Sequence, residues 1–235
     1  MKYLRFFSFM LVFFLLVLNP FESVAVSQME EKIILIDPGH GGRDGGAKTK
    51  NGTIEKEINL DISLKLKKRL EEKGYKVFMT REDDRQLDTT KAKDLAIRCK
   101  MKRDTNCHMF ISIHQNMFQQ ASCFGAQVWY ADNDKSALCA NNIQNGLKEK
   151  INDNNKRIAK CAKTQYKILR DQYDGASVIV ECGFLSNYNE EEKLKSDNHQ
   201  NMIVDGIVLG IDNYFSNSEN QQENDTELNN SVSLH

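Results

Sequence analysis

The chain has 235 residues, of which 28% are charged and 40% hydrophobic, and its formal net charge at pH 7 is −1. This length suits one α/β domain with additions at its ends. Nucleic-acid binding domains usually have a strong basic bias, and its absence here argues against a nucleic-acid partner.

The two ends of the chain differ from the rest. Residues 1–25 have the pattern of a secretory signal, with a basic start, an apolar stretch and the small-x-small cleavage site Ser23-Val-Ala25. The stretch is short for a membrane span, which needs about 20 apolar residues, so an anchor through residues 1–19 is the alternative to cleavage. Residues 216–235 hold almost no apolar side chains and are predicted to be a disordered tail. The sequence therefore predicts an exported protein.

Between these ends, apolar runs rich in Ile and Val alternate with helical stretches. Such runs are typical of buried parallel strands. In chain order, strands are predicted at 32–37, 75–80, 107–113, 126–131, 165–169 (within an ambiguous segment) and 176–181, and helices at 54–73, 91–103, 135–151, 187–196 and 200–215. We therefore expect one α/β domain over residues 26–215, with a mostly parallel, twisted sheet of about six strands and helices on both faces.

Three of the predicted strands lead directly into side chains that can bind a metal or move a proton. The first leads into Asp37-Pro-Gly-His40, the strand at 107–113 leads into His114, and the last strand ends in Glu181. In open α/β sheets, ligands bind in the crevice beyond the carboxyl ends of the strands, so His40, His114 and Glu181 are predicted to meet there. Two histidines and a carboxylate on a rigid sheet are suitable ligands for a catalytic zinc ion.

Four segments of the chain together resemble the zinc-dependent N-acetylmuramoyl-L-alanine amidases of the amidase_3 family. They are Ile36-Asp-Pro-Gly-His-Gly-Gly42, Glu55-Lys56 with Asn59-Leu60, Ser112-Ile-His-Gln-Asn116 and Glu181-x-Gly-Phe-Leu-Ser-Asn187. The likeness extends over about residues 32–215. The small single domain, the Ser-Ile-His-Gln-Asn segment and the helix containing Asp94-Leu-Ala-Ile-Arg98 are most similar to the CwlD-type, germination-specific branch, which acts on the spore cortex.

The resemblance implies a function and a set of site residues. The reaction would be hydrolysis of the amide bond between N-acetylmuramic acid and L-alanine in peptidoglycan. His40, Glu55 and His114 would bind one Zn²⁺ per chain, and Glu181 would take a proton from the attacking water and give one to the leaving amine. The alternatives are another exported zinc amidase or carboxypeptidase that acts on wall peptides, and a catalytically silent wall-binding scaffold.

Two further polar residues near these segments have open interpretations. Asp37 either orients a ligand imidazole or accepts hydrogen bonds from the amides of the Gly-rich loop. Asn116 either binds substrate or fixes its own loop. Arg98, on an apolar helix, is predicted to be a buried ion-pair partner.

The remaining histidines and the cysteines have structural interpretations. His108 is on the same strand as His114 but at its far end, roughly 20 Å away at about 3.3 Å per residue. Cys182 should point to the opposite sheet face from Glu181 and pack there. The six cysteines form no C-x-x-C pair and are predicted to be free thiols, although a Cys139–Cys161 bridge is left open.

The segment Met117–Phe124 combines large apolar side chains with a predicted loop conformation. It contains Met117, Phe118 and Phe124, separated by polar or small residues. Exposed apolar residues mark interaction surfaces, so the segment is expected to border the crevice and to contact substrate or an exported partner protein. The alternative is that these side chains fill a local core beneath the loop.

Overall fold

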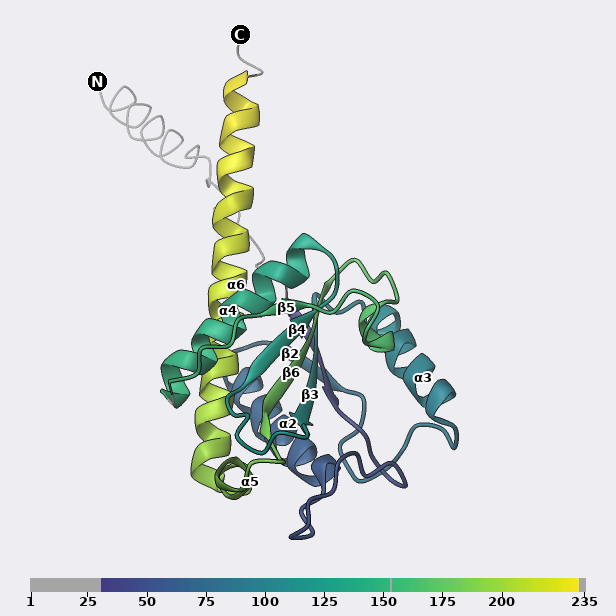
Figure 1. Cartoon of the computed structure of the whole chain (residues 1–235). Helices are drawn as coiled ribbons and strands as arrows, with labels where there is room; N and C mark the ends of the chain where they lie inside the picture. Colours follow the sequence, from purple (N-terminus) through teal and green to yellow (C-terminus); the bar gives the residue numbers. More distant parts are fainter. Residues whose placement is uncertain (1–30, 153, 233–235) are drawn as a thin grey trace, which may run out of the picture. The chain divides into compact units, whose positions relative to one another are not determined.

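The computed structural model describes residues 31–152 and 154–232, with side-chain positions in the last helix described through residue 217. The signal predicted at residues 1–25 lies outside the described residues. The strands (Figure 1) are β1 (Ile33–Pro38), β2 (Lys76–Met79), β3 (Met109–Asn116), β4 (Gln127–Tyr130), β5 (Lys160–Cys161) and β6 (Ala176–Phe184). The helices are α2 (Glu55–Glu72), α3 (Lys91–Asp104), α4 (Asp134–Ile151), the 3-10 helix η1 (Lys167–Leu169), α5 (Tyr188–Leu194) and α6 (Asp197–Val232).

The strands form one six-stranded sheet in the order β2-β1-β3-β6-β4-β5. All neighbours are parallel except β4 and β6, which are antiparallel, so the predicted mostly parallel α/β sheet is confirmed. From β1 the chain passes through α2 to β2 on one side, and then through α3 to β3 on the other side of β1. The gap beyond the carboxyl ends of β1 and β3 is therefore a topological switch point, where ligands bind in folds of this type.

Helices cover both faces of the sheet, as predicted. Helices α2, α4 and α6 contribute to the larger apolar core on one face, whereas α3 and η1 pack against the other face. Figure 1 shows α4 and α6 together on one side of the sheet and α3 on the opposite side.

The alternation of side chains along the strands determines which face carries the polar residues. Leu35, Phe110 and Ile179 belong to the core under α3 and η1. Because residues two or four positions apart on a strand face the same way, Asp37, His114 and Glu181 share this face. The candidate site therefore lies on the side of α3 and η1.

The strand predicted at 165–169 is wrong. The edge strand β5 lies earlier, where Lys160 and Cys161 pair with Trp129 and Tyr130 of β4, and residues 167–169 form η1. Ile168 and Leu169 are both buried in the core under η1, although they are consecutive. A short apolar run gives no periodicity that separates a strand from a packed helical turn, which explains the error.

The carboxyl-terminal end also differs from the prediction. Helix α6 does not end near Phe215 but continues to Val232, through the segment predicted to be a disordered tail. The apolar residues of α6 that pack against α4 and α2 stabilise the first part of the helix, and extending a nucleated helix costs little per residue. In the described ranges of the chain, no helix combines the length and the hydropathy that a membrane crossing requires.

Candidate metal and catalytic site

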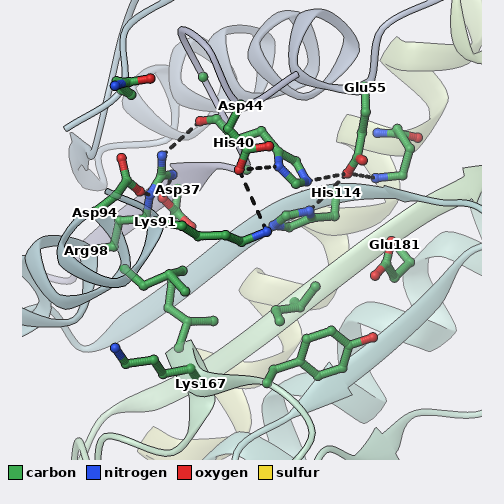
Figure 2. Close-up of a pocket in the computed structure, with 18 of the residues that line it drawn as sticks. Asp37, His40, Asp44, Glu55, Lys91, Asp94, Arg98, His114, Lys167 and Glu181 are labelled. Carbon is green, nitrogen blue, oxygen red and sulfur yellow. Dashed lines mark hydrogen bonds and ion pairs between the residues drawn. The ribbon is translucent and has the colours of Figure 1, made fainter. Parts of the chain in front are cut away.

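His40, Glu55 and His114 lie together at the switch point. One ligand atom from each of the three lies within 4.8 Å of the other two. Glu55 Oε1 is 3.2 Å from His40 Nε2 and 3.0 Å from His114 Nδ1, and the two imidazole rings meet edge to face with centroids 4.9 Å apart. Figure 2 shows the carboxylate of Glu55 beside the two rings, on the side of His40 opposite Asp44. Two nitrogen donors and one carboxylate that converge in this way are a donor set that suits a divalent metal ion.

Glu55 owes its position to the start of α2 and to the loop before it. Its Oε2 accepts a hydrogen bond from the Ala47 amide at 2.8 Å, and its Oε1 accepts one from the Gln115 amide at 3.2 Å. Burial raises the pKa of Glu55, but His114 and His40 lower it more, so the net pKa lies well below its usual value. The carboxylate is therefore ionised, as a metal ligand must be.

Two glycines leave room for the cluster. A Cβ on Gly39 would lie 2.3 Å from the imidazole of His114. Gly46 has a φ of 68°, and a Cβ there would lie 2.5 Å from Glu55 Oε2. The Gly-rich loop thus allows the backbone to approach both side chains, as glycine alone permits.

Two buried arginines hold the loop that presents His40. Arg81 donates to the carbonyl oxygens of Pro38, Gly39 and His40 at 2.8–3.0 Å, and Arg98 donates to those of Pro38 and His40 at 3.0 and 2.8 Å. His40 has a φ of 62°, which costs energy for a non-glycine residue, and these five hydrogen bonds offset that cost. Arg81 was not among the residues expected at the site, because it begins a stretch after β2 that has the composition of a polar loop.

Asp37 has neither of its two predicted roles. Its carboxylate accepts hydrogen bonds at 2.6 Å from Thr80 Oγ1, Ser112 Oγ and Arg98 Nη1. Burial raises the pKa of Asp37, but the Arg98 guanidinium and the two hydroxyls outweigh it and lower the pKa below its usual value. The buried ion pair predicted for Arg98 is confirmed, and Asp37 is the residue that fixes Arg98 beneath the loop.

The carboxylate that contacts a histidine of the cluster is Asp44. Its Oδ2 lies 3.0 Å from His40 Nδ1, on the far side of the ring from Glu55 (Figure 2). Burial lowers the pKa of His40, but Glu55 and Asp44 together raise it above its usual value. A carboxylate on Nδ1 fixes the ring orientation and leaves Nε2 directed at the cluster.

Glu181 is buried beside this cluster without a full set of hydrogen bonds. It is 7% exposed, it pairs with His114 in the register of β3 and β6, and no hydrogen bond within the described residues reaches its Oε2. Burial, together with the negative charge of Glu55, raises the pKa of Glu181 to about 7, although both histidines oppose the shift. A carboxyl group poised near neutrality can both accept and donate a proton.

These residues share one cavity of about 820 Å³. His40, His114 and Glu181, which were predicted to meet because of their strand ends, line it together with Glu55, which the family resemblance implied. Asn116 and Met117 line it as well. The cavity extends from the cluster along the sheet between α3 and the segment that contains η1.

The structural interpretations of the remaining residues agree with the structure. Cys182 is buried in the core on the α2, α4 and α6 side, and all six cysteines, including Cys139 and Cys161, are free thiols. His108 Nδ1 accepts a hydrogen bond from the Ile33 amide at the other end of the sheet from the cluster. Phe118 and Phe124 are 55% and 45% exposed, so the local core proposed for them as an alternative does not form.

The fold and the site define an α/β protein in which two histidines and two carboxylates from widely separated segments share a cavity. The model of the Amidase_3 family, described as N-acetylmuramoyl-L-alanine amidase, matches residues 34–213. The chain belongs to this family.

Named relatives and solved structures support this assignment. The germination-specific N-acetylmuramoyl-L-alanine amidase of Bacillus subtilis is 35% identical over 79% of this chain and 80% of its own length. The structure of the CwlD amidase from Clostridioides difficile in complex with the GerS lipoprotein is 36% identical, with a TM-score of 0.75, and the match covers 79% of this chain and 99% of that one. The catalytic domain of CwlV, an N-acetylmuramoyl-L-alanine amidase from Bacillus (Paenibacillus) polymyxa, is 28% identical with a TM-score of 0.70, covering 79% and 98% of the two chains.

Proposed function

We propose that this chain hydrolyses the amide bond between N-acetylmuramic acid and L-alanine in peptidoglycan, with one zinc ion bound by His40, Glu55 and His114. The observation that carries the proposal is the placement of the buried, incompletely hydrogen-bonded Glu181 in the same cavity as this donor set. The donors fit zinc because it takes nitrogen and carboxylate ligands and, in catalytic sites, only three from the protein. When bound, zinc polarises a carbonyl group and acidifies water.

The side chains around the cluster have separate roles in proton transfer, ligand orientation and substrate binding. Glu181 takes the proton from the attacking water and delivers a proton to the amine of L-alanine as the bond breaks, which requires a pKa near the working pH. Asp44 holds His40 by its Nδ1 and leaves Nε2 for the metal. Asn116, at the end of β3 in the cavity wall, binds the substrate.

We place the enzyme outside the cytoplasm, with spore cortex peptidoglycan as its substrate. The support is the signal pattern of residues 1–25 and the similarity to the germination-specific amidase of Bacillus subtilis. The test is incubation of the purified chain from residue 26 with cortex and with vegetative peptidoglycan. New amino-terminal L-alanine, released faster from cortex, is the expected product. Cleavage elsewhere in the stem peptide would favour a carboxypeptidase, and a folded protein without any hydrolysis would favour a scaffold.

We propose further that the segment Met117–Phe124 is a preformed interaction surface for substrate or for an exported partner protein. Three hydrogen bonds fix the backbone of the segment and of Gly125 directly after it: Phe118 N to Ser186 Oγ (3.2 Å), Asn187 Nδ2 to Cys123 O (3.2 Å) and Gly125 N to Glu190 Oε1 (2.9 Å). The segment nevertheless exposes its large apolar side chains. The related CwlD amidase from Clostridioides difficile forms a complex with a lipoprotein, which is consistent with a partner here.

A charged residue at position 118 tests this surface. Phe118→Glu is expected to leave the unfolding midpoint unchanged, because the side chain is half exposed, and to impair wall cleavage or partner capture. The matched control is Phe78→Glu on the edge strand β2, where an aromatic side chain 37% exposed lies away from the cavity. A large loss of stability with unaltered specific activity of the folded fraction would assign Phe118 to the core instead.

A further inference from the structure

The cavity continues beyond the catalytic cluster as an arm between α3 and the segment 165–170. Its walls include Leu95 of α3, Ile179 of β6 and the half-buried Tyr166. Tyr166 and Glu181 line the same cavity, and burial together with the negative charge of Glu181 raises the pKa of Tyr166 to about 12. The arm therefore begins at the reacting centre and leads away from it along the sheet.

Positive side chains gather along this arm. Lys91 of α3 and Lys167 and Arg170 of the opposite wall all line it. Lys91 approaches a carboxylate of Asp44 only to 3.9 Å, and Lys167 Nζ donates to the backbone oxygen of Ala92 at 3.2 Å. Arg170 is exposed, and its guanidinium has no partner among the described residues.

The acidic residues that line the arm belong to β1, to α3 and to the segment before α3, and none of them is in the wall formed by residues 165–170. Asp94 accepts a hydrogen bond from Arg98 at 2.5 Å, and the same guanidinium pairs with Asp37. Asp88 is engaged by the amide and hydroxyl of Thr90 at the start of α3. The wall formed by residues 165–170 thus carries two positive side chains, Lys167 and Arg170, and no negative one, and such a surface attracts an anionic ligand.

We propose that Lys167 and Arg170 bind carboxylates of the stem peptide, so that the peptide half of the substrate lies in this arm and the glycan half lies toward Met117. The inference rests on the proposed function, since it orients the substrate of that reaction. In a stem peptide, the residues after L-alanine carry free carboxylates, beginning with D-glutamate. The glycan backbone is neutral, because the carboxyl group of its lactyl substituent is in amide linkage. An extended peptide advances about 3.3–3.6 Å per residue, so the carboxylates on the second and third residues lie several ångströms along the arm from the reacting centre.

A pair of substrates that differ only in charge tests this assignment. One is a soluble disaccharide–tetrapeptide with free carboxyl groups, and the other carries carboxamides at the residues after alanine. The intact enzyme is expected to have the lower KM for the acidic substrate and similar kcat for both. Arg170→Gln is expected to reduce this preference about three- to fivefold, the scale of one exposed ion pair, and Arg170→Lys to restore part of it.

Controls separate charge recognition from a loss of folding. Lys163→Gln removes a positive charge from an exposed residue of the neighbouring segment that does not line the cavity, and should keep the full preference. The unfolding midpoint of Arg170→Gln should match that of the intact enzyme, because the guanidinium has no partner to lose. An intact enzyme with equal KM for the two substrates, or a preference that survives Arg170→Gln together with Lys167→Gln, would overturn the assignment. An enzyme that cleaves neither substrate would instead contradict the proposed function.

Discussion

Replacement of Glu181 by glutamine is expected to lower kcat by roughly 100-fold or more, the usual scale for the loss of general acid–base assistance. Glutamine keeps the size of the side chain but cannot accept a proton from the attacking water. Glu181 is outside the cluster of three potential ligands, so the variant should keep its metal content. Turnover on soluble muramoyl peptides and metal analysis of the same preparation check both expectations.

The stability of the variant distinguishes catalysis from packing. A buried carboxyl group with an unpartnered oxygen contributes little to folding, so Glu181→Gln should unfold at a similar or higher temperature than the intact enzyme. Glu192→Gln is the matched control, because it removes an exposed carboxylate on α5 that pairs with the exposed Lys195. Near-normal turnover of Glu181→Gln would show that Glu181 has a structural role and does not carry out the proposed proton transfer.

The second large effect is expected when either of the two proposed histidine ligands of the metal is removed. His40→Ala and His114→Ala are each expected to reduce bound zinc from one equivalent to a small fraction and to abolish hydrolysis, because two remaining donors rarely hold zinc in competition with a chelator. Elemental analysis after gel filtration with a weak chelator measures this. His108→Ala, at the opposite end of β3, should keep one equivalent per folded chain. Unchanged zinc content in both cluster variants would show that the ligand assignment is wrong.

The sequence predicted the parts of the site that follow from strand ends. His114 and Glu181 lie near the carboxyl ends of β3 and β6, and His40 lies two residues after β1. Parallel strands bring their carboxyl ends to one edge of a sheet. Glu55 did not follow from this argument because it begins a helix, where the helix dipole alone favours a glutamate. Its assignment depended on the family resemblance, and the structure places it between the two imidazoles.

The interactions that support the site could not be derived from the sequence. Asp37 lies at the end of β1, three residues before His40. Asp44, four residues after His40, is nevertheless the carboxylate that contacts the imidazole. The left-handed conformation of His40 turns the ring toward Asp44, and no local pattern in a Gly-rich loop predicts that turn. Arg81 contacts Gly39 and His40 across more than 40 residues, a pairing that only the tertiary fold defines.

The most direct test of the account is reconstitution of the metal-free enzyme with zinc. Chelated protein that remains folded is titrated with zinc, and release of amino-terminal L-alanine from purified peptidoglycan is measured at each addition. We expect no hydrolysis without metal, and a linear rise in the rate of L-alanine release that ends at one zinc per chain. Full hydrolysis by the metal-free protein would contradict this expectation.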